Sequence, residues 1–301
     1  MPAFIKTISK SIKKFNRFFF HTIPEHPIAR KNRTKSTARY LKNQLGFNKE
    51  AKVYDWFAGL KYYYQKGDAS FSGNYYFGLA EWQESLFLIK YLQPSDLFLD
   101  IGANHGHYVL IASGYSGCHT IAIEPVSKTY EQLKRNIEVN NLNEKVTLMN
   151  IGLSNRVSQL YFSTDKGTMN KIVDEYYPNK ISVPVQTLDN LNLQPAVIKI
   201  DVEGFEYAVF KGGNETLLSD NLNVIICEIN FTLQEGVSGK DIVDYLSTKG
   251  FSPYYYNGTK MIALKEFNVE TYNTIFVKDI NLVNSRIEKS PPISIWGEKL
   301  F

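Results

Sequence analysis

The feature that most constrains the fold is a regular alternation of short apolar runs and helical patterns, which begins near residue 96 of this 301-residue chain. Five apolar runs predict buried strands, at residues 97–101, 119–124, 145–153, 196–201 and 224–229. Helical patterns follow at 127–140, at 205–218 with a break at the paired glycines 212–213, and at 239–249. Strands and helices that alternate in this way form a parallel sheet with helices on both faces and right-handed crossovers. We therefore predict a doubly wound α/β fold with a mostly parallel sheet.

Two further segments complete the predicted domain. Residues 156–188 look like a hairpin inserted between the third and fourth strands, and three short apolar runs beyond residue 252 predict antiparallel closing strands. We place this domain at residues 94–280 and a C-terminal tail at 281–301.

Composition excludes several classes of protein. Hydrophobic residues make up 44% of the chain and charged residues 21%, which excludes a disordered or collagen-like chain. No stretch approaches the ~18 uninterrupted apolar residues that a membrane-spanning helix needs. The two cysteines, Cys118 and Cys227, are too few for a disulfide scaffold, so we expect buried thiols in a reducing, cytoplasmic compartment.

The N-terminal segment, residues 1–50, is a basic arm with 12 Lys or Arg against two acidic residues, or +10, whereas the remainder carries −6. Its apolar residues at helical spacing are Ile5, Ile8, Ile12, Phe15 and Phe19. A helix with an apolar stripe and a cationic rim is typical of segments on an anionic membrane, so residues 1–20 are predicted to contact the inner face of a membrane peripherally. The alternative is that the stripe packs on the body of the protein. Binding of nucleic acid is disfavoured because few aromatic residues lie among the later basic ones.

Residues 51–93 are rich in Tyr, Trp and Phe and end in a helical pattern at 81–92. Aromatic residues at this density either line a substrate cleft or cover a sheet. We predict an aromatic-rich helical cover.

Carboxylates follow four of the predicted strands, at the point where each strand ends. They are Asp100, Glu124, Asp201, Glu203 and Glu228. Ligands of doubly wound sheets bind outside the carboxyl ends of the strands, so these side chains mark the predicted site.

The loop after the first strand contains Gly102 and Gly106, which permit a sharp turn and a close approach to a ligand. The dinucleotide pattern G-x-G-x-x-G is absent, because Asn104 and His107 occupy its second and third glycine positions. The loop begins with Asp100, and a carboxylate suits an ammonium group better than a phosphate.

Glu124 ends the next strand, where it can accept hydrogen bonds from both hydroxyls of a ribose. A cofactor with a cationic amino-acid part and a ribose satisfies both acids. S-adenosylmethionine is therefore favoured over a nicotinamide dinucleotide.

The order and spacing of these motifs resemble the FkbM-type methyltransferases over about residues 95–230. The matching segments are Asp-Ile-Gly-Ala-Asn-His-Gly at 100–106, Glu124-Pro125, Thr-Leu-Asp at 187–189, Lys-Ile-Asp-Val-Glu-Gly-Phe-Glu at 199–206 and the strand that contains Glu228. The resemblance implies a class I methyltransferase fold, S-adenosylmethionine as the methyl donor, and O-methylation of a sugar, a glycan or a small-metabolite hydroxyl. Trp-Gln-Glu at 82–84 also resembles, loosely, the family's approach to its first strand. The predicted cofactor-binding residues are Glu84, Asp100, Gly102, Asn104, Gly106, Glu124 and Gly152.

A sugar hydroxyl becomes a competent nucleophile when a base removes its proton during attack. Asp201 is the predicted base, with Glu203 beside it, and the loop histidines, His105 foremost, are second candidates. Glu203 could instead cap the following helix. Asp201, Glu203 and Glu228 could also hold Mg²⁺ or Ca²⁺, but nothing in their spacing requires a metal, and none is predicted.

Two other functions remain open from the sequence. One is a non-catalytic cofactor-binding accessory subunit, and the other is a nucleotide-dependent oxidoreductase on the same fold. Intact acids at 201 and 203 disfavour the first, and the departures from the dinucleotide pattern disfavour the second.

Overall fold

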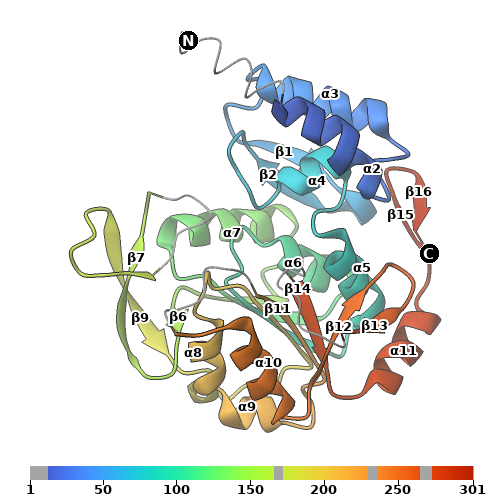
Figure 1. Cartoon of the computed structure of the whole chain (residues 1–301). Helices are drawn as coiled ribbons and strands as arrows, with labels where there is room; N and C mark the ends of the chain where they lie inside the picture. The colour runs from blue at the N-terminus through green and yellow to red at the C-terminus, as the bar shows by residue number, and fades with distance from the viewer. Residues whose placement is uncertain (1–12, 166–171, 230–235, 265–272, 301) are drawn as a thin grey trace. The chain divides into compact units, whose positions relative to one another are not determined.

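The computed structural model describes residues 13–165, 172–229, 236–264 and 273–300. The chain divides into two compact units (Figure 1). The smaller unit comprises Met1–Trp82 and Pro292–Phe301, and the larger comprises Gln83–Pro291. The sequence had suggested four segments, with the C-terminal tail on its own.

The described part of the larger unit contains an eight-stranded sheet of order β13-β12-β14-β11-β10-β3-β4-β5. The strands are β3 (Leu97–Ile101), β4 (His119–Ile123), β5 (Val146–Met149), β10 (Val197–Ile200), β11 (Val224–Glu228), β12 (Ser252–Tyr256), β13 (Met261–Ala263) and β14 (Asn273–Val277). The run from β5 to β11 is parallel, and β14 is antiparallel to both β11 and β12. The predicted doubly wound class I fold is confirmed. The predicted closing strands pair antiparallel: β12 pairs with β13 and with β14, and β14 pairs with β11.

Helices cover both faces of this sheet (Figure 1). They are α5 (Trp82–Tyr91), α6 (His107–Val109) continued by η3 (Leu110–Tyr115), α7 (Ser127–Val139), η5 (Asp189–Leu191), α8 (Glu206–Lys211), α9 (Asn214–Leu218), α10 (Gly239–Ser247) and α11 (Ile280–Lys289). In Figure 1, α5, α6 and α7 lie on one side of the sheet and α8, α9 and α10 on the other. Alternate strand residues point to opposite faces, so Leu99 and Ile198 are buried in the core together with Phe210 of α8 and Ile242 of α10.

The predicted third strand, 145–153, is in fact two strands. It ends as β5 at Met149, and Gly152–Leu153 forms β6 in a different sheet. Asn150 lies at the break, where its side-chain amide donates to the backbone carbonyls of Glu124 (2.8 Å) and Pro125 (3.1 Å). A side chain that binds the backbone in this way competes with the strand ladder, and the apolar pattern does not reveal it.

The predicted insertion is a small sheet of order β6-β9-β7-β8. It consists of β6, β7 (Ser158–Ser163), β8 (Ile172–Val173) and β9 (Lys180–Gln186). β7 and β9 pair as an antiparallel hairpin, as expected, while β6 pairs with β9 in parallel.

The smaller unit combines short helices with two hairpins. Its elements are η1 (Phe18–Thr22), α2 (Ile23–Glu25), α3 (Arg33–Gln44), β1 (Lys52–Asp55), η2 (Phe57–Gly59), β2 (Lys61–Tyr64), α4 (Ser72–Phe77), β15 (Ile293–Ile295) and β16 (Glu298–Leu300). Residues 51–93 were expected to be helical, but β1 and β2 form an antiparallel hairpin there. The rings of β2 stack on rings at the start of α4 and within it, with centroids 4.8 Å apart for Tyr62–Phe71 and 4.5 Å for Tyr64–Tyr75.

The N-terminal apolar stripe lies partly outside the described residues, which begin at Lys13. Its two described members, Phe15 and Phe19, pack against a cluster within the smaller unit in which Phe18 stacks on Tyr40 at 4.3 Å. Ile5, Ile8 and Ile12 fall outside the described residues. Membrane contact through residues 1–20 therefore stays a prediction. None of the helices in the described ranges is long and apolar enough to cross a bilayer.

The C-terminal helix α11, which the sequence analysis left unassigned, is attached to the sheet by an ion pair. The Arg286 guanidinium donates to both carboxylate oxygens of Asp96, at 2.7 and 3.3 Å, and lies 4.7 Å from the centre of the Tyr91 ring. The Arg286 and Asp96 side chains are only 18% and 6% exposed. A bidentate pair with this little solvent stabilises the fold more than a surface pair does.

Replacing Arg286 with Met should lower the free energy of unfolding by about 3 kcal/mol, because the buried Asp96 carboxylate would lose its countercharge. The matched control is Lys240→Met, which removes the exposed pair between Lys240 and Asp244 on α10 and should cost less than about 0.5 kcal/mol. Urea denaturation of both variants measures the difference. Equal losses would show that the Arg286 pair contributes no more than a surface contact.

Candidate active site

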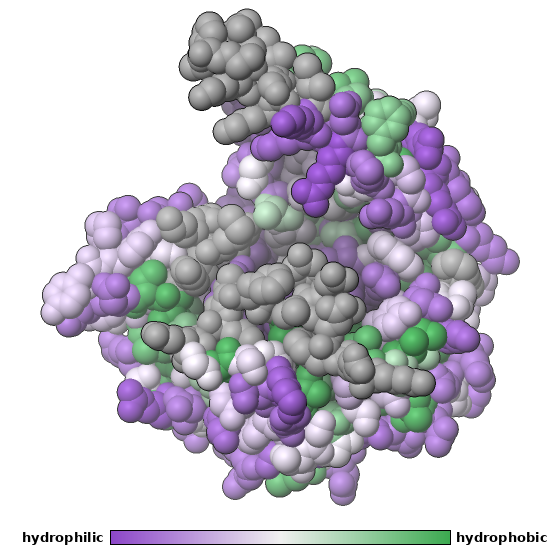
Figure 2. All heavy atoms as spheres, in the orientation of Figure 1, coloured by the Kyte–Doolittle hydropathy of each residue, from purple (hydrophilic) through white to green (hydrophobic). Residues whose placement is uncertain are grey.

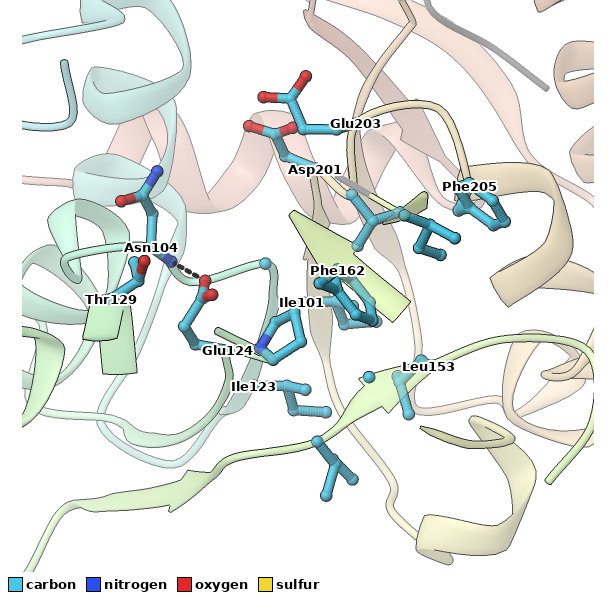
Figure 3. Close-up of a pocket in the computed structure, with 16 residues that line it drawn as sticks. Ile101, Asn104, Ile123, Glu124, Thr129, Leu153, Phe162, Asp201, Glu203 and Phe205 are labelled. Atoms are coloured by element: carbon cyan, nitrogen blue, oxygen red, sulfur yellow. Dashed lines mark hydrogen bonds between the residues drawn. The ribbon is translucent and has the colours of Figure 1, made fainter. Parts of the chain in front are cut away.

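A pocket opens at the carboxyl ends of β3, β4 and β10, where the insertion sheet also reaches the main sheet (Figure 3). It has about 640 Å³ of empty space, part of it open to solvent. Six of the predicted site residues line it: Gly102, Asn104, Glu124, Gly152, Asp201 and Glu203.

The turn after β3 can only be built with glycine at position 102. Gly102 has φ +81°, and a Cβ placed on it would lie 1.9 Å from the backbone oxygen of Asp201. The amides of Gly102 and Ala103 both donate to the carbonyl of Ile123, each at 2.9 Å. The loops that follow β3, β4 and β10 are therefore in mutual contact beneath the pocket.

Glu124 is held rigidly at the end of β4. One carboxylate oxygen accepts the amide of Asn104 at 3.0 Å, and the other accepts the amide of Val126 at 2.9 Å. The side chain is buried, and burial raises the pKa of Glu124 to about 7 against the opposing effect of these two amides. Each carboxylate oxygen has more than one lone pair, so Glu124 can still accept hydrogen bonds from two adjacent hydroxyls.

Asp201 lies directly after β10 and shares a strand face with Lys199. The Lys199 ammonium, which is almost completely buried, lies 3.8 Å from Oδ2 of Asp201. The other oxygen, Oδ1, is shielded from solvent and makes no hydrogen bond with any described residue. The side chain as a whole is 32% exposed and lines the pocket, so a ligand there would reach the carboxylate through Oδ2.

From the sequence, Glu203 could either lie beside the base in the site or cap the following helix. In the structure, Glu203 lines the pocket and Glu206 holds the turn before the helix. One Glu206 oxygen accepts the amides of Val202 (2.9 Å) and Gly204 (3.2 Å), which fixes the turn before α8. Burial raises the pKa of Glu206. Helix α8 has no side-chain cap on its first residue, and Glu203, with φ +53°, lines the pocket instead. Figure 3 shows Asp201 and Glu203 at the same end of the pocket.

The other predicted residues do not line the pocket. Asp100 is only 2% exposed and lies in register with Lys199, on the face of the sheet opposite the main core cluster. Gly106 allows the loop to approach α7, because a Cβ there would lie 2.6 Å from Leu133. Glu84 is half-buried on α5, and His105 is half-buried in the loop.

His107, the other loop histidine, is unsuited to proton transfer near neutral pH. Its Nε2 is hydrogen-bonded to the Ser85 hydroxyl at 2.8 Å, and burial, with a smaller contribution from Lys199, lowers the pKa of His107 to about 3. His107 therefore stays neutral and links the glycine loop to α5.

Sequence reasoning missed the apolar wall of the pocket. Its residues are Ile101, Ile123, Ile151, Leu153, Phe162, Ile172, Val202 and Phe205. Phe162 and Ile172 come from the insertion strands, where Phe162 also packs on Val126 at the start of α7. The alternating pattern of the insertion predicts that one face of it is apolar. It does not predict that this face contacts the pocket, because that contact depends on long-range packing.

The residues present fit S-adenosylmethionine better than a metal ion. A flat apolar wall suits a purine, Glu124 suits a ribose diol, and Asp201 suits the positive charge of the sulfonium end. Among residues with described positions, no group of three His, Cys, Asp or Glu side chains could hold a metal, so Asp201, Glu203 and Glu228 form no such site there. Both cysteines are buried thiols, as expected.

A Gly102→Ala variant tests the contact beneath the pocket. The methyl group would collide with the carbonyl of Asp201, so unfolding should cost about 2–4 kcal/mol less than in the parent chain, from left-handed strain and overpacking together. Gly117→Ala is the matched control, since Gly117 has φ +77° but no atom nearer than 3.5 Å to its added Cβ. It should lose only about 1 kcal/mol. Equal destabilisation in thermal or urea unfolding would contradict the proposed packing.

Comparison with known proteins identifies the domain. A family model described as the methyltransferase FkbM domain matches residues 100–253, slightly more than half of the chain. The hexuronic acid methyltransferase AglP of Haloferax volcanii is 28% identical over 170 residues, which cover 53% of this chain and 65% of that protein. The match therefore covers less than two thirds of the length of this relative.

Solved structures with a similar fold include an FkbM methyltransferase from Methylobacillus flagellatus, at 14% identity, a TM-score of 0.45, and coverage of 69% of this chain and 52% of that one. TYW2 from Pyrococcus horikoshii, in complex with MeSAdo, matches at 15% identity and a TM-score of 0.44, over 81% of this chain and 83% of that one. The family match over residues 100–253 places the strand-end carboxylates and the glycine loop within one methyltransferase domain. The chain therefore belongs to the FkbM methyltransferase family, whose methyl donor is S-adenosylmethionine.

Proposed function

We propose that this chain is an O-methyltransferase that acts on a hydroxyl of a sugar, a glycan or a related small metabolite. The observation that carries the proposal is the pocket itself, in which two carboxylates from different strand ends, Glu124 and Asp201, line the same cavity. The relative from Haloferax volcanii is named as a methyltransferase of a hexuronic acid, which supports a saccharide acceptor.

Binding of the donor rests on three parts of the pocket. Glu124 accepts hydrogen bonds from the ribose, the apolar wall with Phe162 receives the purine, and the turn at Gly102 lets the ligand approach the backbone closely. Asp201 and Glu203 provide negative potential at the opposite end. When bound, S-adenosylmethionine supplies an activated methyl group on a positively charged sulfur.

Asp201 serves as the base in this proposal. As the acceptor oxygen forms its bond to the methyl carbon, the bond from that carbon to the donor sulfur breaks. The acceptor O–H bond breaks as well, and the proton passes to the Asp201 carboxylate, which later releases it to solvent. The Lys199 ammonium lies 3.8 Å from Oδ2 of Asp201, which orients the carboxylate. Glu203 lies at the same end, where it can orient the acceptor. His105 does not line the pocket and is the weaker candidate for the base.

The alternatives from the sequence are now less favoured. Membership of a methyltransferase family argues against a nucleotide-dependent oxidoreductase. An accessory subunit without turnover would need no base beside the cofactor pocket. A screen of sugars and glycans with isotopically labelled methyl donor, followed by mass spectrometry, tests turnover directly.

Asp201→Asn should lower turnover by about 10²–10⁴-fold, because it removes a base without changing shape. It should weaken S-adenosylmethionine binding by no more than about tenfold, because Glu203 still provides negative charge at that end of the pocket. The control is Asp220→Asn, which replaces an exposed carboxylate that is remote in sequence from the pocket residues. It should leave both the affinity and the turnover unchanged. If Asp201→Asn weakened binding and turnover equally, Asp201 would be a binding residue. Asp100 does not line the pocket, so the role at the ammonium group predicted from the sequence requires Asp100→Asn to reduce cofactor affinity. Unchanged affinity would assign Asp100 a structural role.

The affinity for S-adenosylmethionine should fall as the pH decreases below about 7. The pKa of Glu124 is raised to about 7, so the carboxyl group is progressively protonated below that pH, and a protonated carboxyl group accepts the ribose hydroxyls less well. The loss approaches tenfold per pH unit if binding requires the ionised form. Calorimetry measures the affinity of the parent chain and of Glu124→Gln as a function of pH. The variant cannot titrate at position 124, so the difference between the two pH profiles reports Glu124 alone. Identical pH profiles would contradict a direct role for Glu124.

A further inference from the structure

The smaller unit exposes large apolar side chains at the C-terminal end of α3. Leu41, Leu45 and Phe47 are 45%, 75% and 63% exposed, whereas most large apolar side chains of this unit are covered. Leu41 and Leu45 are four residues apart and therefore lie on the same face of the helix. Figure 2 shows hydrophobic residues beside strongly hydrophilic ones on this unit, at the top of the view.

The opposite face of α3 is already engaged in packing. Tyr40 stacks on Phe18, and the Asn43 side chain, 4% exposed, donates a hydrogen bond to the Tyr76 hydroxyl. Leu41 and Leu45 are thus exposed on the face of α3 that is turned away from its packing contacts with Phe18 and Tyr76. It is also distinct from the N-terminal stripe, since Phe15 and Phe19 pack in the Tyr40 cluster.

Ammonium groups surround these apolar side chains. Lys52 donates to the carbonyl of Phe47 at 3.4 Å, and Lys66 donates to the carbonyl of Gln44 at 3.2 Å. Lys42 is exposed on α3 between Leu41 and Leu45. Each ammonium group has three protons, so Lys52 and Lys66 retain two for other ligands after these bonds. We refer to Leu41, Lys42, Leu45, Phe47, Lys52 and Lys66 as the α3 patch.

The charge of the whole unit has the same sign. Residues 1–82 and 292–301 contain 16 Lys or Arg and six Asp or Glu, a formal charge of +10, whereas the complete chain carries only +4. The positive charge is therefore concentrated in the unit that bears the exposed apolar residues. Residues 41–68 contain five lysines and three acids, Glu50, Asp55 and Asp68, so the local balance is also positive.

We propose that the α3 patch docks the smaller unit on an anionic lipid bilayer. Apolar side chains that enter the headgroup region and lysines that reach the lipid phosphates from the rim are the recognition elements of an interfacial membrane site. Two of the three apolar side chains are leucines, which offer no ring for stacking on bases, so the pattern fits lipid better than nucleic acid.

The test is co-sedimentation of the full chain with phosphatidylcholine vesicles that contain phosphatidylserine, and with pure phosphatidylcholine vesicles. The parent chain should bind the anionic vesicles, bind the neutral ones much more weakly, and dissociate as the salt concentration increases. Leu45→Ser combined with Phe47→Ser should lower the partition coefficient at least about tenfold. Lys52→Gln combined with Lys66→Gln should lower it about 20-fold.

The matched control is Val157→Ser combined with Leu218→Ser, two exposed apolar residues of the larger unit, which should bind like the parent chain. Unchanged melting temperatures show that the variants remain folded. Equal binding of the parent and both α3 patch variants, or no binding of the parent to anionic vesicles, overturns the proposal. The proposal is also overturned if the parent chain binds no vesicles but self-associates, and if Leu45→Ser combined with Phe47→Ser abolishes that self-association. The α3 patch would then bind a second copy of the chain. Methyl transfer to a soluble acceptor is independent of all these outcomes.

Discussion

The site depends on the contact between the turn after β3 and the turn after β10. Gly102 approaches the carbonyl of Asp201 so closely that no side chain fits between them, and the same turn is hydrogen-bonded to the carbonyl of Ile123 at the end of β4. This contact brings the ends of three parallel strands together. Glu124 and Asp201, 77 positions apart in the sequence, consequently line one pocket, and the chemistry of the domain follows from their proximity.

Electrostatics then give the two carboxylates different properties. Each oxygen of Glu124 accepts one backbone amide, which fixes the direction of the carboxylate, while burial raises its pKa to about 7 against the effect of those amides. Asp201 is partly exposed, with a buried ammonium on one oxygen and a shielded, unbonded second oxygen. The environment of Glu124 suits a static hydrogen-bond acceptor, and the environment of Asp201 suits a group that gains and loses a proton. Glu206, which the sequence showed only as part of a motif, holds the turn that carries Asp201 and Glu203.

Much of this arrangement was predictable from residue patterns, and the exceptions have physical causes. Apolar runs separated by helical periodicity predict the parallel strands. Of the five carboxylates that the strand-end rule selects, Glu124, Asp201 and Glu203 line the pocket. The break at Asn150 was missed because a side-chain hydrogen bond interrupts a continuous apolar run. The burial of Asp100 was missed because a strand's sequence does not say whether its polar residue faces the ligand or the covering helices. Phe162 and Ile172 reach the pocket through long-range packing of the insertion, and no local pattern encodes that.

The central claim is that Glu124 grips the ribose of the donor while the sulfonium end lies toward Asp201. A crystal structure of the chain soaked with S-adenosylhomocysteine, the demethylated product, tests it most directly. The account predicts both ribose hydroxyls at about 2.6–3.0 Å from the Glu124 oxygens, with the thioether sulfur on the Asp201 side of the pocket. A nucleoside bound elsewhere, or one bound here in the reverse orientation with its ribose away from Glu124, would contradict it.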